Sequence, residues 1–298
     1  MHFRILDDSM KQSFDLHCHT TASDGTLTPE ELVEHAYQNQ VYTVAITDHD
    51  TCAGISEAVE KGKEYNITVI PGIEISVDFN PGTMHICGYY IDPQNKYFQK
   101  RITDVQNARN NRNPQIIQKL NESGINITLD EVRHESGKDH IGRPHFAQVL
   151  HKKGYVTSVS EAFNKYLAKG SCCYVHRKRL GIPEAIELIH KAHGIAVLAH
   201  PNQLGLSSWE EYKKWFIYLK ELGIDGIEIF SSCHSKRESE HFKSFADELN
   251  LLTTGGSDFH GTNKPEAHLG VFGDNNTINI KELIEQMKKQ RNLYTIVT

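Results

Sequence analysis

The chain has no apolar run long enough to span a membrane, and its first eight residues carry acids where a signal peptide needs a cationic and then an apolar segment. Its six cysteines form no Cys-x-x-Cys pair, so neither a disulfide framework nor a thiolate zinc site is expected. The net charge of -6 argues against a generally basic surface that coats nucleic acid. We expect a cytoplasmic protein with reduced thiols, no membrane contact and no evident protein partner.

Three catalytic signatures are also missing. The sequence has no Gly-x-Ser-x-Gly elbow, no Walker loop and no dinucleotide fingerprint, so it predicts neither a serine nucleophile nor a nucleotide cofactor. The stretch Gly255-Gly256-Ser257 could be mistaken for a phosphate loop. We interpret it as close backbone packing beneath Asp258.

What is present is a repeating pattern of short apolar, β-branched runs, most of them separated by helical segments. At 298 residues this pattern predicts an α/β fold with a mainly parallel sheet, and seven strands favour a small (β/α) barrel. The expected strands are residues 14–16, 44–46, 69–75, 86–91, 195–199, 227–230 and 251–253.

Two departures from this repetition are expected. The turn-like Asn80-Pro81-Gly82-Thr83 predicts that residues 84–92 fold back as a hairpin partner, which would bring His85 toward Glu74. Between residue 92 and about residue 183 polar and amphipathic helical segments take over. We therefore predict a barrel from residues 13–94 and 184–298, with residues 95–183 as a helical insertion that acts as a lid or specificity element.

The histidines, 18 in all, include a group with metal-binding spacing. His17 and His19 stand at positions i and i+2 of an expected strand, so both face the same side, although a pair of surface histidines is the plain alternative. Most of the other candidates follow the carboxyl ends of strands, which converge on one mouth of a barrel. The full candidate set is His17, His19, Asp24, His49, Glu74, His85, His200, Asp258 and His260.

Nine nitrogen and oxygen ligands without a thiolate exceed the four that a structural zinc needs. They predict two or three divalent ions with bridging carboxylates and open positions for water and substrate. Mn²⁺, Zn²⁺ and Fe²⁺ all suit mixed imidazole and carboxylate ligands. Mn²⁺ is favoured because several hard oxygens are shared.

These motifs resemble those of the polymerase and histidinol phosphatase (PHP) family over roughly residues 13–92 and 195–262. The resemblance implies a distorted seven-stranded barrel and a trinuclear site. One ion would sit on His17, His19, Glu74 and Asp258. A second would share Glu74 and take His85 and His200, and a third would use Asp24, His49 and His260.

A second anion site is expected in the insertion. Arg143 precedes Pro144, which can begin a helix, and a guanidinium at a helix N-terminus can bind phosphate with help from His145. A salt bridge between Arg143 and a nearby acid is the alternative. The stretch Gly142-Arg143-Pro144-His145 resembles that of a PHP subfamily that hydrolyses nucleoside 3′,5′-bisphosphates and trims short RNA from the 5′ end.

Other basic residues of the insertion are ambiguous. Arg109 and Arg112 share one face of an expected helix and are candidate substrate ligands, but solvated surface charge is the simpler interpretation. The same holds for Lys169. The basic run of residues 176–179 could meet an RNA backbone or could simply be a loop.

The predicted function is hydrolysis of the 3′-phosphate of nucleoside 3′,5′-bisphosphates, with trimming of short 5′-phosphorylated RNA from 5′ to 3′, by attack of a metal-bound hydroxide. A histidinol-phosphate phosphatase would share the ligand set without needing an anchor in the insertion. An amidohydrolase is a weaker alternative, because it usually wants a strand-end lysine and fewer ligands. A noncatalytic metal-binding or RNA-binding module also stays open.

Overall fold

The computed structural model describes residues 13–137, 141–273 and 277–296, and side chains up to residue 292. The first eight residues, whose acids argue against a signal peptide, lie outside these ranges. Seven strands form one sheet in chain order. They are β1 (Phe14–Cys18), β2 (Thr43–Ile46), β3 (Thr68–Val77), β4 (Met84–Tyr89), β5 (Ile195–Leu198), β6 (Gly226–Ser231) and β7 (Leu252–Gly256).

Strands β1, β2 and β3 pair in parallel, as do β5, β6 and β7, whereas β4 runs antiparallel to both of its neighbours. Beyond the ends of β1 and β7, a bridge joins Cys18 to Phe259 and nearly closes the sheet into a barrel. The predicted α/β barrel with seven strands is therefore confirmed.

The closure explains the paired glycines at the end of β7. A Cβ atom at Gly256 would collide with the backbone of His17, so only glycine lets β7 approach β1 this closely. Beyond the pair, the backbone N–H of Phe259 donates to the carbonyl of His17 at 3.2 Å. The interpretation of residues 255–257 as close backbone packing is confirmed.

The hairpin of β3 and β4 also forms as predicted. Ser76 lies opposite His85 in the antiparallel register, so His85 stands at the start of β4 beside the end of β3. Side chains alternate along a strand, and Glu74 therefore faces the same side as Ser76, toward His85. Antiparallel pairing thus brings a residue at the beginning of a strand to the mouth where the parallel strands end.

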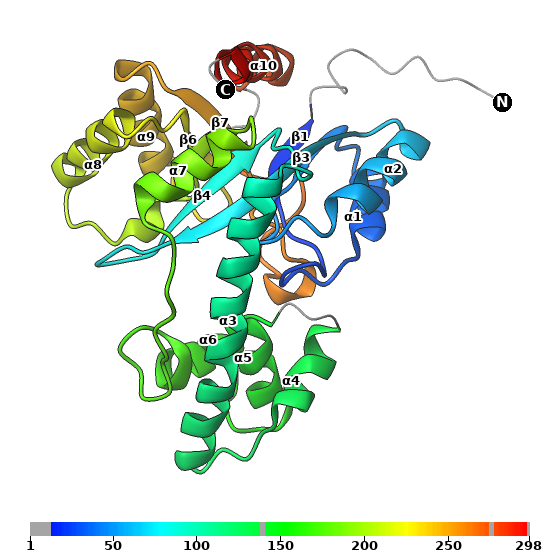
Figure 1. Cartoon of the computed structure of the whole chain (residues 1–298), viewed down its shortest axis with the longest axis vertical. Coiled ribbons are helices and arrows are strands. Elements are labelled where there is room, and N and C mark those ends of the chain that lie inside the picture. Colours follow the sequence, from blue (N-terminus) through cyan, green and yellow to red (C-terminus); the bar gives the residue numbers. More distant parts are fainter. Residues whose placement is uncertain (1–12, 138–140, 274–276, 297–298) are drawn as a thin grey trace.

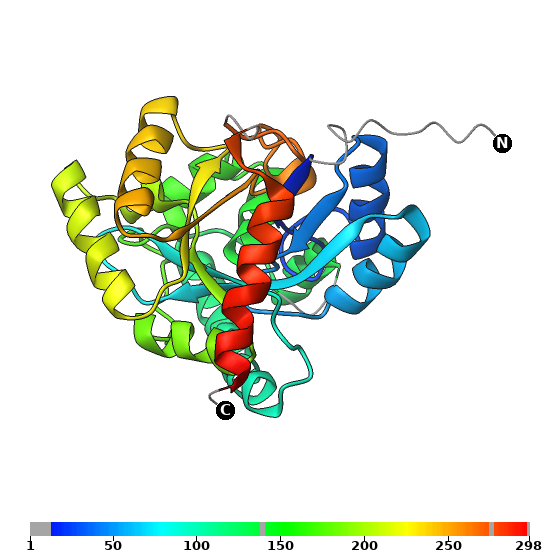
Figure 2. The same cartoon turned by 90° about the horizontal axis from the view of Figure 1, so that it is seen from above.

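Helices surround the barrel (Figures 1 and 2). Helix α1 begins with a capping box: the Thr28 hydroxyl accepts from the Glu31 N–H while the Glu31 carboxylate accepts from the Thr28 N–H. The C-terminal helix crosses the end of the barrel that lies opposite the helical insertion. The helices are α1 (Pro29–Gln38), α2 (Ile55–Tyr65), α7 (Ile182–Lys191), α8 (Trp209–Glu221), α9 (Lys236–Glu248) and α10 (Ile280–Ile296), with short 3-10 turns at Pro201–Leu204 and Gly261–Asn263.

Between β4 and α7 the chain is helical (Figure 1). The first half of the long helix α3 (Lys96–Glu122) packs on the barrel through Phe98 and Ile102, and its second half enters a separate apolar core through Ile116 and Leu120. The remaining elements are α4 (Leu129–Ser136), α5 (Arg143–Lys152), α6 (Val159–Ala162) and a π-helical turn, Phe163–Leu167. The predicted helical segment is therefore present, while the exact domain boundaries stay a prediction.

No helix within the described part of the chain is both long and apolar enough to cross a membrane.

Candidate metal centre

The nine predicted ligands come together at the mouth of the barrel. Each belongs to at least one of four overlapping groups in which the nitrogen and oxygen ligand atoms lie within 4.8 Å of one another. These groups are His17 with Glu74 and His200; His17 with His19 and Asp258; His49 with Glu74 and His85; and His19 with Asp24, His49 and His260.

Glu74 lies at the centre of this arrangement and is fully buried. Its Oε1 accepts hydrogen bonds from His85 Nδ1 at 2.8 Å and His200 Nε2 at 2.9 Å. Its Oε2 lies 2.8 Å from His49 Nδ1 and 3.3 Å from His19 Nε2. Because its two oxygens face different histidines, the carboxylate has the geometry of a bridging ligand.

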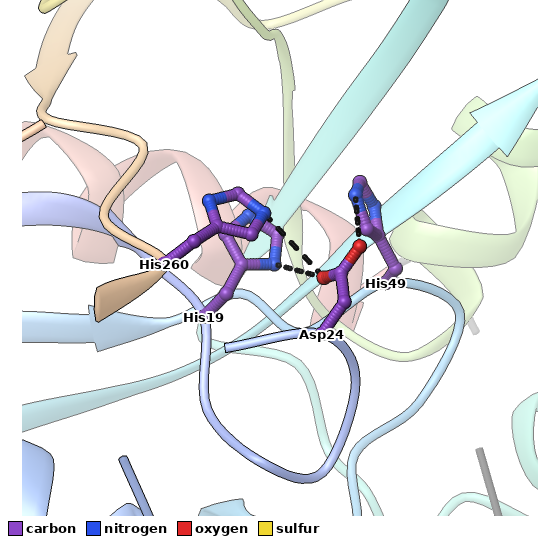
Figure 3. Close-up of side chains that lie close together, drawn as sticks. All are labelled: His19, Asp24, His49 and His260. Atoms are coloured by element: carbon purple, nitrogen blue, oxygen red, sulfur yellow. Dashed lines mark ion pairs between the residues drawn. The ribbon is translucent and has the colours of Figure 1, made fainter. Parts of the chain in front are cut away.

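Asp24 belongs to the group with His19, His49 and His260, which Figure 3 shows. Its Oδ1 lies 3.4 Å from His260 Nε2 and 3.8 Å from His19 Nδ1, and its Oδ2 lies 3.8 Å from His49 Nε2. His19 therefore turns one ring nitrogen toward Glu74 and the other toward Asp24. The His19 ring thus lies between Glu74 and Asp24, which the sequence analysis assigned to different ions.

Several of the converging atoms are unsatisfied. His19 Nε2, Asp24 Oδ1 and Glu74 Oε2 are buried, and although oppositely charged groups lie close to them, none of the three atoms makes a well-oriented hydrogen bond. Buried polar atoms are nearly always paired, and each of these atoms is a type that coordinates divalent cations. The residues present therefore fit a multinuclear site for divalent ions.

The electrostatics of the cluster favour cations. Burial opposes ionisation of Glu74, but His49, His85 and His17 hold the pKa of its carboxyl well below the ordinary value. The carboxyl of Asp258 follows the same pattern. Burial raises its pKa, but His17 and His260 outweigh burial and hold the pKa well below the ordinary value. Both carboxylates are ionised at neutral pH, as metal ligands must be.

Glu228 in β6 supports the site, and we did not predict it. Its Oε1 accepts from His17 Nδ1 at 2.9 Å, and its Oε2 accepts from the backbone N–H of His200 at 2.7 Å. A carboxylate behind a ligating histidine fixes the ring orientation and the tautomer. The available signal was an acid inside the apolar strand of residues 227–230.

Asp48, which follows β2, has a different role. Its carboxylate accepts from the Thr20 N–H at 2.8 Å, the Thr20 hydroxyl at 2.7 Å and the Ser23 hydroxyl at 2.5 Å. These bonds hold the loop that carries Asp24. Asp48 therefore positions a candidate ligand and belongs to none of the metal groups.

A cavity of about 420 Å³ opens in front of the candidate ligands. Pro144, Val159 and Phe163 of the helical segment form one wall, which agrees with the predicted position of the insertion beside the mouth. Lys264 also lines the cavity, and its Nζ lies 2.7 Å from Asp258 Oδ2. This lysine was not among the sequence-based candidates.

Next to the metal centre lies a group of arginines that we call the arginine cluster: Arg109, Arg112, Arg143, Arg177 and Arg179. The expectation that Arg109 and Arg112 are solvated surface charges is wrong, because they are only 6% and 4% exposed. Helix α3 buries their shared face against the loop that returns from the insertion. Arg177, in the basic run of residues 176–179, is also buried, at 5% exposed.

Positive charge in the cluster is only partly compensated. Arg109 and Arg177 both donate to Asp50 Oδ2, the latter at 2.8 Å. Asp50 is the one carboxylate with an ion pair to the cluster among the residues that the structure describes. Arg112 Nε, Arg177 Nη1 and Arg179 Nε have no hydrogen-bond partner.

The partly compensated positive charge also lowers the pKa values of arginines in the cluster. Burial, followed by repulsion from neighbouring arginines, lowers the pKa of Arg112 well below its ordinary value. The same two effects outweigh the attraction of Asp50 and lower the pKa of Arg177 to about 10. A bound anion would relieve this repulsion, so the cluster has the character of a phosphate site.

The arginine cluster and the metal centre meet at Gly142, the N-cap of α5. A Cβ atom placed there would lie 3.5 Å from Arg109 Nη1 and 3.9 Å from Asp24 Oδ2. A guanidinium of the cluster and a candidate metal ligand therefore both lie close to this glycine. A molecule with two phosphates could reach both.

Arg143 has no carboxylate partner within the described ranges, contrary to the salt-bridge alternative. Its Nη1 donates to the carbonyl of Leu167 at 3.0 Å, and its guanidinium lies near the rings of Phe163 and Tyr174, 5.7 and 5.6 Å from their centroids. His145 Nδ1 accepts from the Gly142 N–H at 3.0 Å and so caps the helix. A role for either residue toward phosphate stays a prediction.

Lys169 is exposed, as expected, and its Nζ donates to Asn80 Oδ1 at 2.6 Å.

Comparison with known proteins gives consistent results. Residues 15–232 match the PHP domain family. The chain is 36% identical over 252 residues to a 5′-3′ exoribonuclease of Haemophilus influenzae, covering 84% of this chain and 91% of that protein. It is 31% identical over 263 residues to a 3′,5′-nucleoside bisphosphate phosphatase of Chromobacterium violaceum, covering 88% and 92%. A proposed metal-dependent phosphoesterase from Bifidobacterium adolescentis superposes with a TM-score of 0.82 at 30% identity, covering 93% and 95%.

Proposed function

Since the chain belongs to the PHP family and is a metal-dependent phosphoesterase, we propose that it removes the 3′-phosphate of nucleoside 3′,5′-bisphosphates and trims short 5′-phosphorylated RNA from 5′ to 3′. The observation that carries this proposal is the arginine cluster beside the candidate metal centre, with Gly142 close to both. A monophosphate substrate would need only the metal centre.

The metal centre takes the scissile phosphate in this proposal. The nine candidate ligands hold two or three divalent ions, with Mn²⁺ favoured over Zn²⁺ and Fe²⁺ because Glu74, Asp24 and Asp258 contribute hard oxygens. Ions of this kind acidify bound water and neutralise charge on phosphoryl oxygens. Glu228 and Asp48 contribute by orienting His17 and the Asp24 loop.

The arginine cluster takes the 5′-phosphate. Unpaired guanidinium nitrogens supply charge-assisted donors, and the N-terminus of α5 adds its own partial positive charge. His145 holds the Gly142 end of this helix in place. The phosphate then compensates charge that Asp50 alone leaves unbalanced.

This geometry accounts for both activities with one binding mode. A nucleoside 3′,5′-bisphosphate has the same two phosphates as the first nucleotide of a 5′-phosphorylated RNA. With the 5′-phosphate on the arginines and the 3′-phosphorus at the metals, the P–O3′ bond breaks in either substrate. In the RNA, the next nucleotide keeps the phosphate and becomes the new 5′ end.

Histidinol phosphate has a single phosphate and would leave the arginine cluster without an anion, so it is the weaker candidate. The relatives in the comparison are named for nucleotide and RNA substrates, which favours the same choice. A cytoplasmic location, where such substrates occur, is part of the proposal.

The test is phosphate release from adenosine 3′,5′-bisphosphate, adenosine 3′-monophosphate and histidinol phosphate, with 5′-phosphorylated and 5′-hydroxyl oligoribonucleotides alongside. Each substrate is assayed with Mn²⁺, Zn²⁺, Fe²⁺ and Mg²⁺. We expect the bisphosphate and the 5′-phosphorylated RNA to have the highest kcat/KM. A preference for histidinol phosphate, or no effect of the 5′-phosphate, would rule the proposal out.

A further inference from the structure

Lys264 occupies a distinctive position in the cavity in front of the metal centre. It follows the 3-10 turn Gly261–Asn263, and its side chain is 20% exposed. Among the described residues that line this cavity, it is the only lysine or arginine. The cavity therefore has one permanently cationic side chain that is separate from the arginine cluster.

Asp258 holds this side chain in place. Its Oδ2 lies 2.7 Å from Lys264 Nζ, whereas its Oδ1 lies 3.3 Å from His19 Nε2 and 3.5 Å from His17 Nε2. One oxygen is thus available to the metal group and the other binds the ammonium. Lys264 sits on the cavity side of the carboxylate, where a substrate enters.

The position of Lys264 matches a requirement of the proposed reaction. In phosphoryl transfer the attacking and leaving oxygens lie roughly in line on opposite sides of phosphorus. If water attacks phosphorus from the side of the candidate metal ligands, the leaving oxygen therefore lies on the opposite side, toward the open cavity. The leaving O3′ belongs to an alcohol, and the negative charge that develops on it needs a cation or a proton donor.

We propose that Lys264 is a catalytic residue whose ammonium donates a hydrogen bond to the leaving O3′. The inference rests on the proposed phosphoesterase function and adds a residue to it. In this step an oxygen from water bonds to phosphorus as the P–O3′ bond breaks, and O3′ acquires its proton from solvent. Lys264 stays protonated throughout.

A lysine ammonium has an ordinary pKa of about 10.4, so Lys264 is charged at neutral pH. A group of this kind stabilises charge rather than transferring its proton.

The test compares Lys264→Met with wild type on two monoesters under Mn²⁺: an alkyl phosphate, whose leaving alcohol is a poor leaving group, and 4-nitrophenyl phosphate, whose leaving phenolate needs little help. Removing one donor to a developing oxyanion costs roughly 100-fold or more in kcat. We expect a loss of this size on the alkyl ester and a much smaller loss on the nitrophenyl ester. Lys264→Arg should recover part of the alkyl-ester activity.

Two further measurements separate catalysis from a structural role. Bound metal per chain, measured by mass spectrometry, should be unchanged in Lys264→Met. The matched control is Lys243→Met, which removes an exposed lysine paired with Asp247 and should behave as wild type. Equal losses on the two esters, loss of bound metal, or an Arg variant as poor as the Met variant would each overturn the assignment.

Failure of the proposed function gives a different result. In that case the wild-type protein would release no phosphate from adenosine 3′,5′-bisphosphate with any divalent ion, and the inference would fall with it. If the wild type turns over both esters, the comparison of variants decides the role of Lys264 alone.

Discussion

Arg177 Nη2 donates to Asp50 Oδ2 at 2.8 Å, although the two residues are separated by 127 positions in the chain. Asp50 directly follows the candidate metal ligand His49, and its remaining oxygen accepts from the Ser76 N–H at 3.0 Å. The ion pair therefore ties the loop that returns from the insertion to the strands that carry the metal centre. Loss of this ion pair should lower the free energy of unfolding and weaken substrate binding.

Replacing Asp50 with Asn should destabilise the protein strongly. The change keeps the shape of the side chain but leaves Arg109 and Arg177 buried without a counter-charge. Breaking a buried pair in this way costs about 3–5 kcal/mol in the free energy of unfolding. Urea unfolding followed by circular dichroism measures it.

The matched control is Asp130→Asn, which breaks an exposed pair with Arg133. That change should be almost neutral, since exposed ion pairs contribute little. If the two variants unfold at similar urea concentrations, the Asp50 ion pairs are not important for stability.

The stabilisation by Asp50 should also depend on pH. Burial raises its pKa, but Arg177 and Arg109 outweigh burial and lower it far below the ordinary value. A carboxyl with a depressed folded-state pKa stabilises above its unfolded pKa of about 4 and loses that contribution as the pH falls further. The difference in unfolding free energy between wild type and Asp50→Asn should be constant from pH 6 to 7 and shrink below about pH 4.

Arg143→Ala should discriminate between substrates. A hydrogen bond to a charged group contributes about 1.5–3 kcal/mol, so kcat/KM for adenosine 3′,5′-bisphosphate should fall about 10- to 100-fold. Activity on adenosine 3′-monophosphate should survive better, because that substrate has no 5′-phosphate. Steady-state kinetics on the two nucleotides gives both values.

Arg133→Ala serves as the control, because Arg133 is exposed and pairs with Asp130, which has no contact with the arginine cluster in the described ion pairs. It should leave both substrates unaffected. Equal losses on the two nucleotides for Arg143→Ala would show that Arg143 does not anchor the 5′-phosphate.

Glu74→Ala should remove metal from more than one position. Its two oxygens face five histidines, so the substitution deletes the shared ligand of two predicted ions at once. Metal content after dialysis should drop by more than one ion per chain, and activity should be lost. Glu248→Ala, which breaks an exposed pair with Lys213, is the control. Full metal content in the Glu74 variant would refute the bridging role.

Glu228→Gln should weaken metal binding without removing a ligand. The amide cannot replace the charge that holds His17 Nδ1, and loss of such support typically lowers metal affinity 10- to 100-fold. Competition with a fluorescent chelator measures the change. Excess metal should restore most of the activity. An unchanged affinity would limit Glu228 to packing within the barrel.

Local patterns in the sequence were sufficient for much of the fold. Short apolar, β-branched runs identified all seven strands. The turn at residues 80–83 was enough to predict that His85 reaches Glu74. These features depend on short-range geometry, which a sequence displays directly.

The arginine cluster could not be found in this way. Arginines three positions apart on a polar helix look solvated, and burial depends on what packs over them. Here the cover comes from Asp50 and the returning loop, which are distant in sequence. Lys264 was missed for a similar reason, since its pairing with Asp258 and its place in the cavity follow only from the folded chain.

The sequence by itself determined the barrel strands and the nine candidate ligands, because strand periodicity and ligand chemistry are properties of neighbouring residues. Only the tertiary structure decided how Glu74 divides its oxygens, which acid supports His17, and that Asp50 pairs with two of the five clustered arginines. These are relations between segments far apart in the chain. Their energies depend on burial and distance, which exist only after the barrel closes and the helical insertion folds over its mouth.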